Sequence, residues 1–241
     1  MKSRTHNQES LVIVYDAEQV QHPGPHLFDE TYWRERGAVE GEAAGRGSAL
    51  FLDTPFGPAV LRRYLRGGWP AKVSRDRYLF NGWQRSRPQD EFRILADLAT
   101  HDLPVPHPLA AITRRNGPFY TGALITRRIG GAETLADLME SRCGDAGLWQ
   151  SVGACVRRFH DFGVVHADLN ARNILVDEQD RIFLIDFDRA RISRGDTRSC
   201  ASNIARLKRS IEKLWPPAVA AQMEACWHAL LEGYGQEGES T

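Results

Sequence analysis

One stretch of the chain, VVHADLNARNILVDEQDRIFLIDFDRAR, crowds polar side chains around two short apolar runs. His166 and Asp168 precede the run NILV, which begins with Asn173, and Asp186 and Asp188 follow the run IFLI. The carboxylate and amide oxygens in this set are ligands of the kind that Mg²⁺ prefers. Two interpretations are open: an ordinary hairpin with acidic turns, or a site that holds magnesium and a phosphate donor. Features elsewhere in the sequence distinguish the two interpretations.

Composition restricts the class of protein. The 241 residues suffice for one large domain or two small lobes, and the 42% apolar and 26% charged content is that of an ordinary globular chain. Lys+Arg and Asp+Glu both number 31, so no net charge favours nucleic acid as a partner. The four cysteines lack C-x-x-C spacing, which indicates reduced thiols rather than zinc ligands or disulfides. The sequence lacks a signal-peptide pattern and a run of ~20 apolar residues, so we expect a cytosolic protein, with attachment to a membrane surface left open.

The pattern of apolar residues predicts strands in the first half of the chain and helices in the second. Strand-like runs are expected at 11–16, 48–53, 59–65, 109–113 and 119–126, and helices at 87–102, 135–139, 148–162, 204–214 and 219–231. Proline at position 88 suits a helix start, and Gly163 suits a helix end. We therefore predict an α+β fold of two lobes, with a strand-rich N-lobe over 1–126 and a mainly helical C-lobe over 127–241.

The polar stretch resembles the catalytic half of the protein-kinase-like fold. The family pattern H-x-D-L-x-x-x-N is intact as HADLNARN, and the position of D-F-G is occupied by DFD at 186–188. The resemblance implies that Asp168 is the catalytic residue that accepts or orients the proton of the attacking hydroxyl, and that Asn173 and Asp186 hold Mg²⁺. His166 is interpreted as a hydrogen-bonding brace rather than a proton shuttle.

Weaker matches to the same fold lie upstream and imply an ATP site. The run GRGSALFL resembles a shortened phosphate-covering loop, in which Gly45 and Gly47 approach the phosphates; a plain hairpin turn is the alternative. Arg62 stands where the family has a strand lysine, and Lys72 is the fallback.

Four further residues complete the ATP site that the resemblance implies. Glu91 is the expected ion-pair partner of the strand cation, with Asp90 as its competitor. The backbone of Thr126, Arg127 and Arg128 is expected to hydrogen-bond adenine.

Several departures argue against a protein kinase. Asp188 replaces the glycine of D-F-G, no A-P-E motif follows, and Asn170 occupies the position where Ser/Thr protein kinases have lysine. The residues after Asp186 are too few for the usual peptide-binding helices. These features favour a small-molecule or lipid-linked acceptor.

Across residues 25–215 the chain resembles the lipopolysaccharide kinase family, and within it the 3-deoxy-D-manno-octulosonic acid (Kdo) kinases. The resemblance rests on the segments GRGSALFL, AVLRRYLRGG, DRYLF, SRPQDEFRILADL, LPVPHPLAA, LITRRIGGAETLADLM, HADLNARNILVD, LIDFDRARI and NIARLKRS. It implies ATP-dependent phosphorylation of a Kdo hydroxyl, at O-4, on a Kdo–lipid A precursor. The implied location is the cytoplasmic face of the inner membrane of a Gram-negative bacterium, with peripheral attachment. The alternatives are a related kinase acting on a heptose or an antibiotic hydroxyl, and a pseudokinase scaffold.

Basic and aromatic residues alternate in the predicted N-lobe, and we interpret them as a surface for anionic headgroups. A solvated loop with a few core aromatics is the alternative. The residues concerned are Arg62, Arg63, Arg66, Lys72, Arg75, Arg77, Arg85 and Arg87, with Trp69, Tyr78, Phe80 and Trp83. Beyond Asp186, Arg189 and Arg191 are interpreted as charge on a solvated loop, with contact to an acceptor carboxylate as the alternative.

Overall fold

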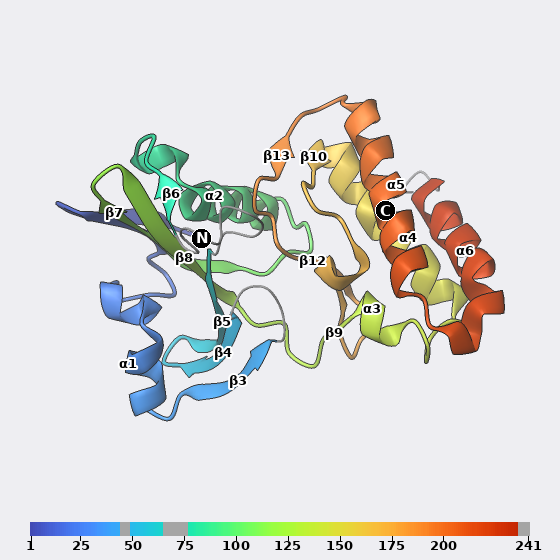
Figure 1. Ribbon diagram of the computed structural model, residues 1–241, viewed down its shortest axis with the longest axis horizontal. Coiled ribbons are helices and arrows are strands. Elements are labelled where there is room, and N and C mark those ends of the chain that lie inside the picture. Colours follow the sequence, from blue (N-terminus) through green and yellow to red (C-terminus); the bar gives the residue numbers. More distant parts are fainter. Residues whose placement is uncertain (44–48, 65–76, 236–241) are drawn as a thin grey trace. The chain divides into compact units, whose positions relative to one another are not determined.

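A computed structural model describes residues 1–43, 49–64 and 77–235, and all structural statements below refer to these residues (Figure 1). The chain divides into two compact units. The first unit comprises residues 1–100 and 106–128, and the second comprises residues 101–105 and 129–241. The predicted lobe boundary at 126/127 stays a prediction.

The first unit is built on an antiparallel eight-stranded sheet. The strand order is β1-β2-β7-β8-β5-β4-β3, and β6 pairs with β8. The strands are β1 (Ser3–Gln8), β2 (Leu11–Asp16), β3 (Val39–Ala43), β4 (Ala49–Thr54), β5 (Gly57–Arg63), β6 (Tyr78–Leu79), β7 (Pro108–Asn116) and β8 (Phe119–Arg127). The strands predicted from apolar runs are confirmed. Strands β1, β3 and β6 were not predicted, because β1 and β3 consist mostly of polar or small residues and β6 has only two residues.

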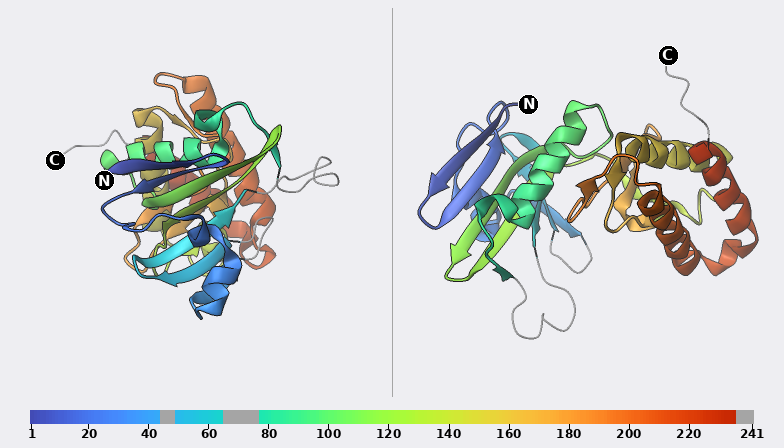
Figure 2. Two further views of the ribbon diagram at one scale, coloured as in Figure 1. Left: turned by 90° about the vertical axis from the view of Figure 1, so that its left-hand side faces the viewer. Right: turned by 90° about the horizontal axis from the view of Figure 1, so that it is seen from above.

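Two helices and two short 3-10 turns accompany this sheet. They are η1 (Pro25–Phe28), α1 (Glu30–Glu35), η3 (Trp83–Arg85) and α2 (Arg87–Thr100). Helix α2 begins at the predicted position and buries Phe92, Leu95 and Leu98 against β7 and β8 (Figure 2). Helix α1 was not predicted. It is a single short helix, held by the buried Trp33, whose indole N–H donates to the Leu27 carbonyl over 2.8 Å.

The second unit is mainly helical, as predicted. It contains β9 (Glu133–Thr134), α3 (Leu135–Leu138), α4 (Ala146–Phe162), β10 (Val164–Val165), η4 (Ala171–Asn173), β11 (Ile174–Val176), β12 (Ile182–Leu184), β13 (Arg191–Ile192), α5 (Thr197–Leu214), η5 (Pro217–Gln222) and α6 (Met223–Gly235). Helix α4 ends at the predicted Gly163, which has φ +95°. The last helix begins at Met223 rather than at Val219, because Val219 is non-helical at φ −121° and two prolines precede it. None of the described helices is long and apolar enough to cross a membrane.

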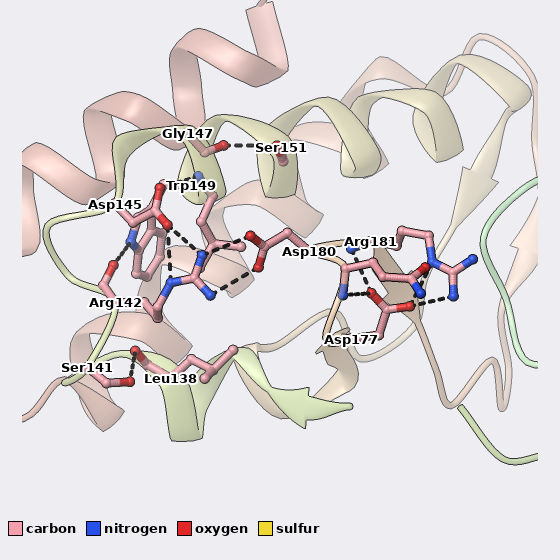
Figure 3. Close-up of polar contacts among 12 residues, drawn as sticks. Leu138, Ser141, Arg142, Asp145, Gly147, Trp149, Ser151, Asp177, Asp180 and Arg181 are labelled. Atoms are coloured by element: carbon pink, nitrogen blue, oxygen red, sulfur yellow. Dashed lines mark hydrogen bonds and ion pairs between the residues drawn. The ribbon is translucent and has the colours of Figure 1, made fainter. Parts of the chain in front are cut away.

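An ion-pair network fixes the hairpin formed by β11 and β12 (Figure 3). The guanidinium of Arg142 lies 2.5 Å from the carboxylate of Asp145, the N-cap of α4, and 3.0 Å from that of Asp180 in the hairpin turn. These bonds to Asp180 and Asp145 raise the pKa of Arg142, which therefore stays charged. Within the turn, Asp177 accepts the N–H groups of Gln179 and Arg181, each at 2.9 Å. Asp177 and Asp180 are therefore turn residues.

Helices α4 and α6 lie side by side with their backbones in close approach at two glycines (Figures 1 and 2). A Cβ added to Gly153 would lie 1.9 Å from the Leu230 carbonyl oxygen, and one added to Gly233 would lie 1.9 Å from the Gln150 carbonyl oxygen. Real Cβ atoms do not approach backbone so closely, so any side chain at these positions pushes the two helices apart.

Gly153→Ala is therefore expected to destabilise the protein by about 1–3 kcal/mol, the usual cost of overpacking a tight contact. Urea unfolding followed by far-UV circular dichroism measures the change. Gly147→Ala is the matched control in the same helix, because its added Cβ meets only the Asp145 side chain, at 3.5 Å. The control should be neutral or slightly stabilising, and an equal loss in both variants would contradict the glycine crossing.

Candidate active site

The neutral ring of His166 joins the two segments that carry the predicted site. Its Nε2–H donates to the Ile185 carbonyl over 3.0 Å, and its Nδ1 accepts the N–H of Asp168 over 3.1 Å. Only a neutral imidazole protonated at Nε2 can make both bonds. Burial lowers the pKa of His166 and so favours this form. The geometry is that of the predicted brace.

Helix α5 supports the same loop from the other side. The buried Asn203 side chain donates to the His166 carbonyl over 2.8 Å and accepts the His166 N–H over 3.1 Å. Two turns further along, Ser210 Oγ accepts the N–H of Ala171 over 3.2 Å. Sequence reasoning missed these residues. The only signal was a polar residue, Asn203, at the helical spacing of the apolar positions Leu207 and Ile211.

Two amide side chains converge on the backbone of Asp168. Asn173 Nδ2 and Asn170 Nδ2 each donate to the Asp168 carbonyl over 2.9 Å. Asn170 also caps η4 by accepting the N–H of Arg172 over 2.9 Å. Since the amino group of Asn173 faces this carbonyl, its Oδ1 is directed to the opposite side. The residue that replaces the kinase lysine, Asn170, thus has a local structural role.

Asp186 lies next to Asn173 across the base of the hairpin. The N–H of Ile185, its neighbour, donates to the Asn173 carbonyl over 3.0 Å. Asp186 has φ +63°, a left-handed conformation that non-glycine residues adopt only when their surroundings hold them. The fully buried Phe187 supplies that anchor, with its ring centroid 5.0 Å from that of His166. The hydrogen bond from Ile185 to Asn173 places the backbone of Asn173 beside the segment that bears Asp186, and the metal site formed by the two residues stays a prediction.

The carboxylate of Asp168 is open to solvent. Its side chain is 62% exposed, and Arg206 Nη1 on α5 lies 3.5 Å from its Oδ1. An exposed carboxylate on a hydrogen-bonded backbone can meet a hydroxyl group without displacing other parts of the protein. Among the described residues, no group of three or more His, Cys, Asp or Glu side chains could hold a metal ion.

In the first unit, the predicted ion pair between Arg62 and Glu91 is confirmed. Glu91 is 2% exposed, and one of its oxygens lies 2.5 Å from Arg62 Nη2. The hydroxyl of Tyr64 also donates to Glu91. Asp90, the competitor, pairs instead with Arg93 at 3.0 Å. Contact of Arg62 and Glu91 with phosphates stays a prediction.

The other predicted nucleotide contacts remain open. Gly45, Gly47 and Lys72 lie outside the described residues. In the segment expected to contact adenine, Thr126 and Arg127 end β8, and the N–H of Arg127 donates to the His107 carbonyl over 2.8 Å.

The N–H of the following Arg128 donates to the Pro58 carbonyl over 3.0 Å. The N–H groups of Arg127 and Arg128 therefore serve the backbone of the first unit, and the adenine contact stays a prediction.

The chain was compared with known proteins. The family model described as "Lipopolysaccharide kinase (Kdo/WaaP) family" matches residues 30–234. A "3-deoxy-D-manno-octulosonic acid kinase" of Xanthomonas euvesicatoria pv. vesicatoria (strain 85-10) is 45% identical over 202 residues, 84% of this chain and 80% of that protein. Proteins of the same name from Stenotrophomonas maltophilia (strain R551-3) and Vibrio vulnificus (strain CMCP6) are 44% and 39% identical. These matches cover 84% and 92% of this chain, and 80% and 94% of those proteins.

The neutral histidines predict a pH dependence of stability. Burial lowers the pKa of both His166 and His160, whereas in the unfolded chain histidine titrates near ~6.5. Below about pH 6.5 the unfolded chain therefore binds more protons than the folded chain, and the free energy of unfolding falls as the pH falls.

Urea unfolding between about pH 5 and about pH 7.5 measures this slope. His166→Gln removes one of the two groups and is expected to make the slope shallower, at the cost of lower stability throughout. A variant that keeps the wild-type slope would contradict the neutral, buried state of His166.

Proposed function

This chain belongs to the lipopolysaccharide kinase (Kdo/WaaP) family and is a phosphotransferase, and we propose that it transfers the γ-phosphoryl group of ATP to O-4 of Kdo on a Kdo–lipid A precursor. The names of its relatives support Kdo as the acceptor. The observation that carries the proposal is the hydrogen-bonded unit that His166 forms with Asp168, Asn173 and Ile185, the residue next to Asp186. A plain acidic hairpin does not require this arrangement.

Asp168 orients the acceptor hydroxyl and accepts its proton. The carboxylate is exposed, and the two amides and the imidazole that bind its backbone hold it in place. Phosphoryl transfer depends mainly on positioning and on stabilisation of charge, so a rigid, accessible carboxylate suits the reaction.

Asn173 and Asp186 would hold Mg²⁺. One offers a neutral amide oxygen and the other a carboxylate, and both are the hard donors that this ion selects. Magnesium commonly takes one or two protein ligands and fills its remaining positions with water and phosphate oxygens. The pair therefore fits the ion even without a larger acidic cluster. When bound, the ion would neutralise charge on the phosphates.

Arg62 would bind the phosphates of ATP. Its guanidinium is held on β5 by the buried Glu91, which in turn accepts the Tyr64 hydroxyl. Arginine presents five N–H donors in a planar fork, so it can keep this carboxylate and still bind a phosphate oxygen. An arginine is thus a workable replacement for the lysine of other kinases.

The attachment to the inner-membrane surface would use the segment around β6. Leu79 is 61% exposed, and the half-buried Phe80 and Trp83 pack edge to face at 4.9 Å beside it. The exposed Arg77 and Arg85 flank them. This combination of apolar, aromatic and basic side chains suits an anionic lipid interface.

Several other residues of the predicted basic and aromatic surface are either buried or outside the described residues. Tyr78 is buried and stacks on Tyr120 at 5.4 Å, so it belongs to the core. Arg66, Trp69, Lys72 and Arg75 lie outside the described residues.

Mass spectrometry of purified protein with ATP, Mg²⁺ and Kdo–lipid IVA tests the reaction and the acceptor together. The product is expected to gain one phosphoryl group, mapped to O-4 of Kdo. Asp168→Asn should lower kcat by about 10²- to 10⁴-fold, because the amide cannot accept a proton.

Asp161→Asn is the control, since Asp161 lies outside the candidate site and forms an exposed ion pair with Arg157. A product formed only from a heptosylated acceptor would overturn the acceptor. Absence of product together with absence of a thermal shift on adding ATP and Mg²⁺ would favour the scaffold.

Co-sedimentation with vesicles of anionic and zwitterionic phospholipid tests the membrane surface. Leu79→Ser is expected to weaken binding about tenfold or more, since burying a leucine contributes ~1.5–3 kcal/mol. Arg77→Ala with Arg85→Ala should remove a salt-dependent part of the binding, at about 1 kcal/mol for each charge. Leu231→Ser on α6, 37% exposed, is the matched control. Equal binding of the Leu79 and Leu231 variants would refute this surface.

A further inference from the structure

A cation that the kinase pattern does not specify lies beside the catalytic carboxylate. Arg206 on α5 places its Nη1 3.5 Å from Asp168 Oδ1, although the two residues are separated by 38 positions in the sequence. The Arg206 side chain is 46% exposed and the Asp168 side chain 62%, so both groups can reach a ligand in solvent.

The position of Arg206 is fixed by its helix rather than by a loop. Asn203, one turn before it, forms two hydrogen bonds with the backbone of His166. Ser210, one turn after it, bonds to the backbone of Ala171. The adjacent Leu207 is fully buried. Arg206 is thus held at a set place along the catalytic loop while its guanidinium remains accessible, as a binding group requires.

Stability does not account for this arginine. An exposed ion pair at 3.5 Å is loose, and pairs of this kind contribute little to folding. Within the described residues, the contact with Asp168 is the only ion pair recorded for Arg206, and it uses one of five N–H donors. The remaining donors suit a second anion, and a planar fork matches a carboxylate in particular.

Several other arginines of the second unit are engaged in ion pairs. Arg191, considered from the sequence as a contact for an acceptor carboxylate, pairs with Asp196 at 2.8 Å and donates to Ser199 Oγ over 2.9 Å at the start of α5. Other arginines of the second unit that are paired with carboxylates are Arg142, Arg157 and Arg181.

We propose that Arg206 binds the carboxylate of an acid-sugar acceptor and thereby sets the acceptor hydroxyl against Asp168. This inference rests on the proposed function, in which the acceptor is an octulosonic acid. In such a sugar C1, the carboxylate carbon, and C4, which bears the hydroxyl, are three bonds apart, and at ~1.5 Å per bond they lie within ~4 Å of each other. One side of the acceptor can therefore meet Arg206 and Asp168 at once. Arg206 would thus select acid sugars over neutral ones.

The first test compares steady-state kinetics of Arg206→Ala, Arg206→Lys and the control Arg209→Ala. Arg209 is exposed on the same helix, one turn further along. Arg206→Ala is expected to raise the KM for the Kdo acceptor about 10- to 100-fold, as loss of a charged hydrogen bond would. The KM for ATP and kcat should change less than about twofold. The acceptor KM of Arg206→Lys should lie between those of the wild type and Arg206→Ala. The acceptor KM of Arg209→Ala should equal that of the wild type.

The second test changes the acceptor. Reduction of the Kdo carboxylate to an alcohol should lower kcat/KM of the wild type by the same factor as the Arg206→Ala substitution does. The kcat/KM of Arg206→Ala should be no lower with the reduced acceptor than with the normal one. Removal of the lipid A phosphates should affect both proteins equally. If instead Arg206→Ala became insensitive to those phosphates, the anion bound would be a phosphate and the carboxylate assignment would be wrong.

Two outcomes separate this inference from the function it rests on. A wild-type enzyme that does not phosphorylate the Kdo acceptor would overturn both. A wild type that does so, with an Arg206→Ala variant whose kcat falls while its acceptor KM is unchanged, would overturn only the role of Arg206. That pattern would make Arg206 a positioning residue for Asp168.

Discussion

The candidate site depends on one neutral imidazole. His166 can accept from Asp168 and donate to Ile185 only while it carries a single ring proton. Protonation would turn Nδ1 into a donor that faces the N–H of Asp168, so the loop bearing Asp168 and the segment bearing Asp186 would lose their common brace. The ring is buried, and the Asn203 side chain forms hydrogen bonds with both the N–H and the carbonyl of His166. Burial therefore lowers the pKa of His166, and the neutral ring holds the loop in one conformation.

Each unit, taken by itself, has an arginine among its candidate functional residues. In the first unit, Arg62 stands at the strand position of the kinase lysine and is oriented by a carboxylate that is almost fully buried. In the second unit, Asn170 caps η4, and Arg206 on α5 provides a cation next to Asp168. Guanidinium groups keep their charge in partly buried surroundings and bind anions through two parallel hydrogen bonds. Both positions thus suit phosphate or carboxylate ligands better than a lone ammonium group would.

The elements that sequence reasoning found are those with a strong local pattern. Helices α2 and α4 have apolar stripes with proline or glycine at an end, and β2, β7 and β8 are rich in apolar residues. Strand β1 was missed because its side chains are almost all exposed and it is held by pairing with β2 alone. The start of α6 was placed too early because apolar composition continues through the 3-10 turn, where two prolines govern the backbone.

By itself the sequence determined the chemical groups of the site and their order. HADLNARN and DFD, joined by a hairpin, predicted an acid, an amide and a metal carboxylate, because each lies in a local motif. The resemblance to the kinase fold predicted the ion pair of Arg62 with Glu91. Only the tertiary structure decided what holds and surrounds these groups. Asn203, Arg206 and Ser210 reach the loop that bears Asp168 from α5, across 37 to 39 positions of sequence. Contacts between such distant residues leave no periodic signal in the sequence, and they arise only when helix packing brings one face of α5 against the loop.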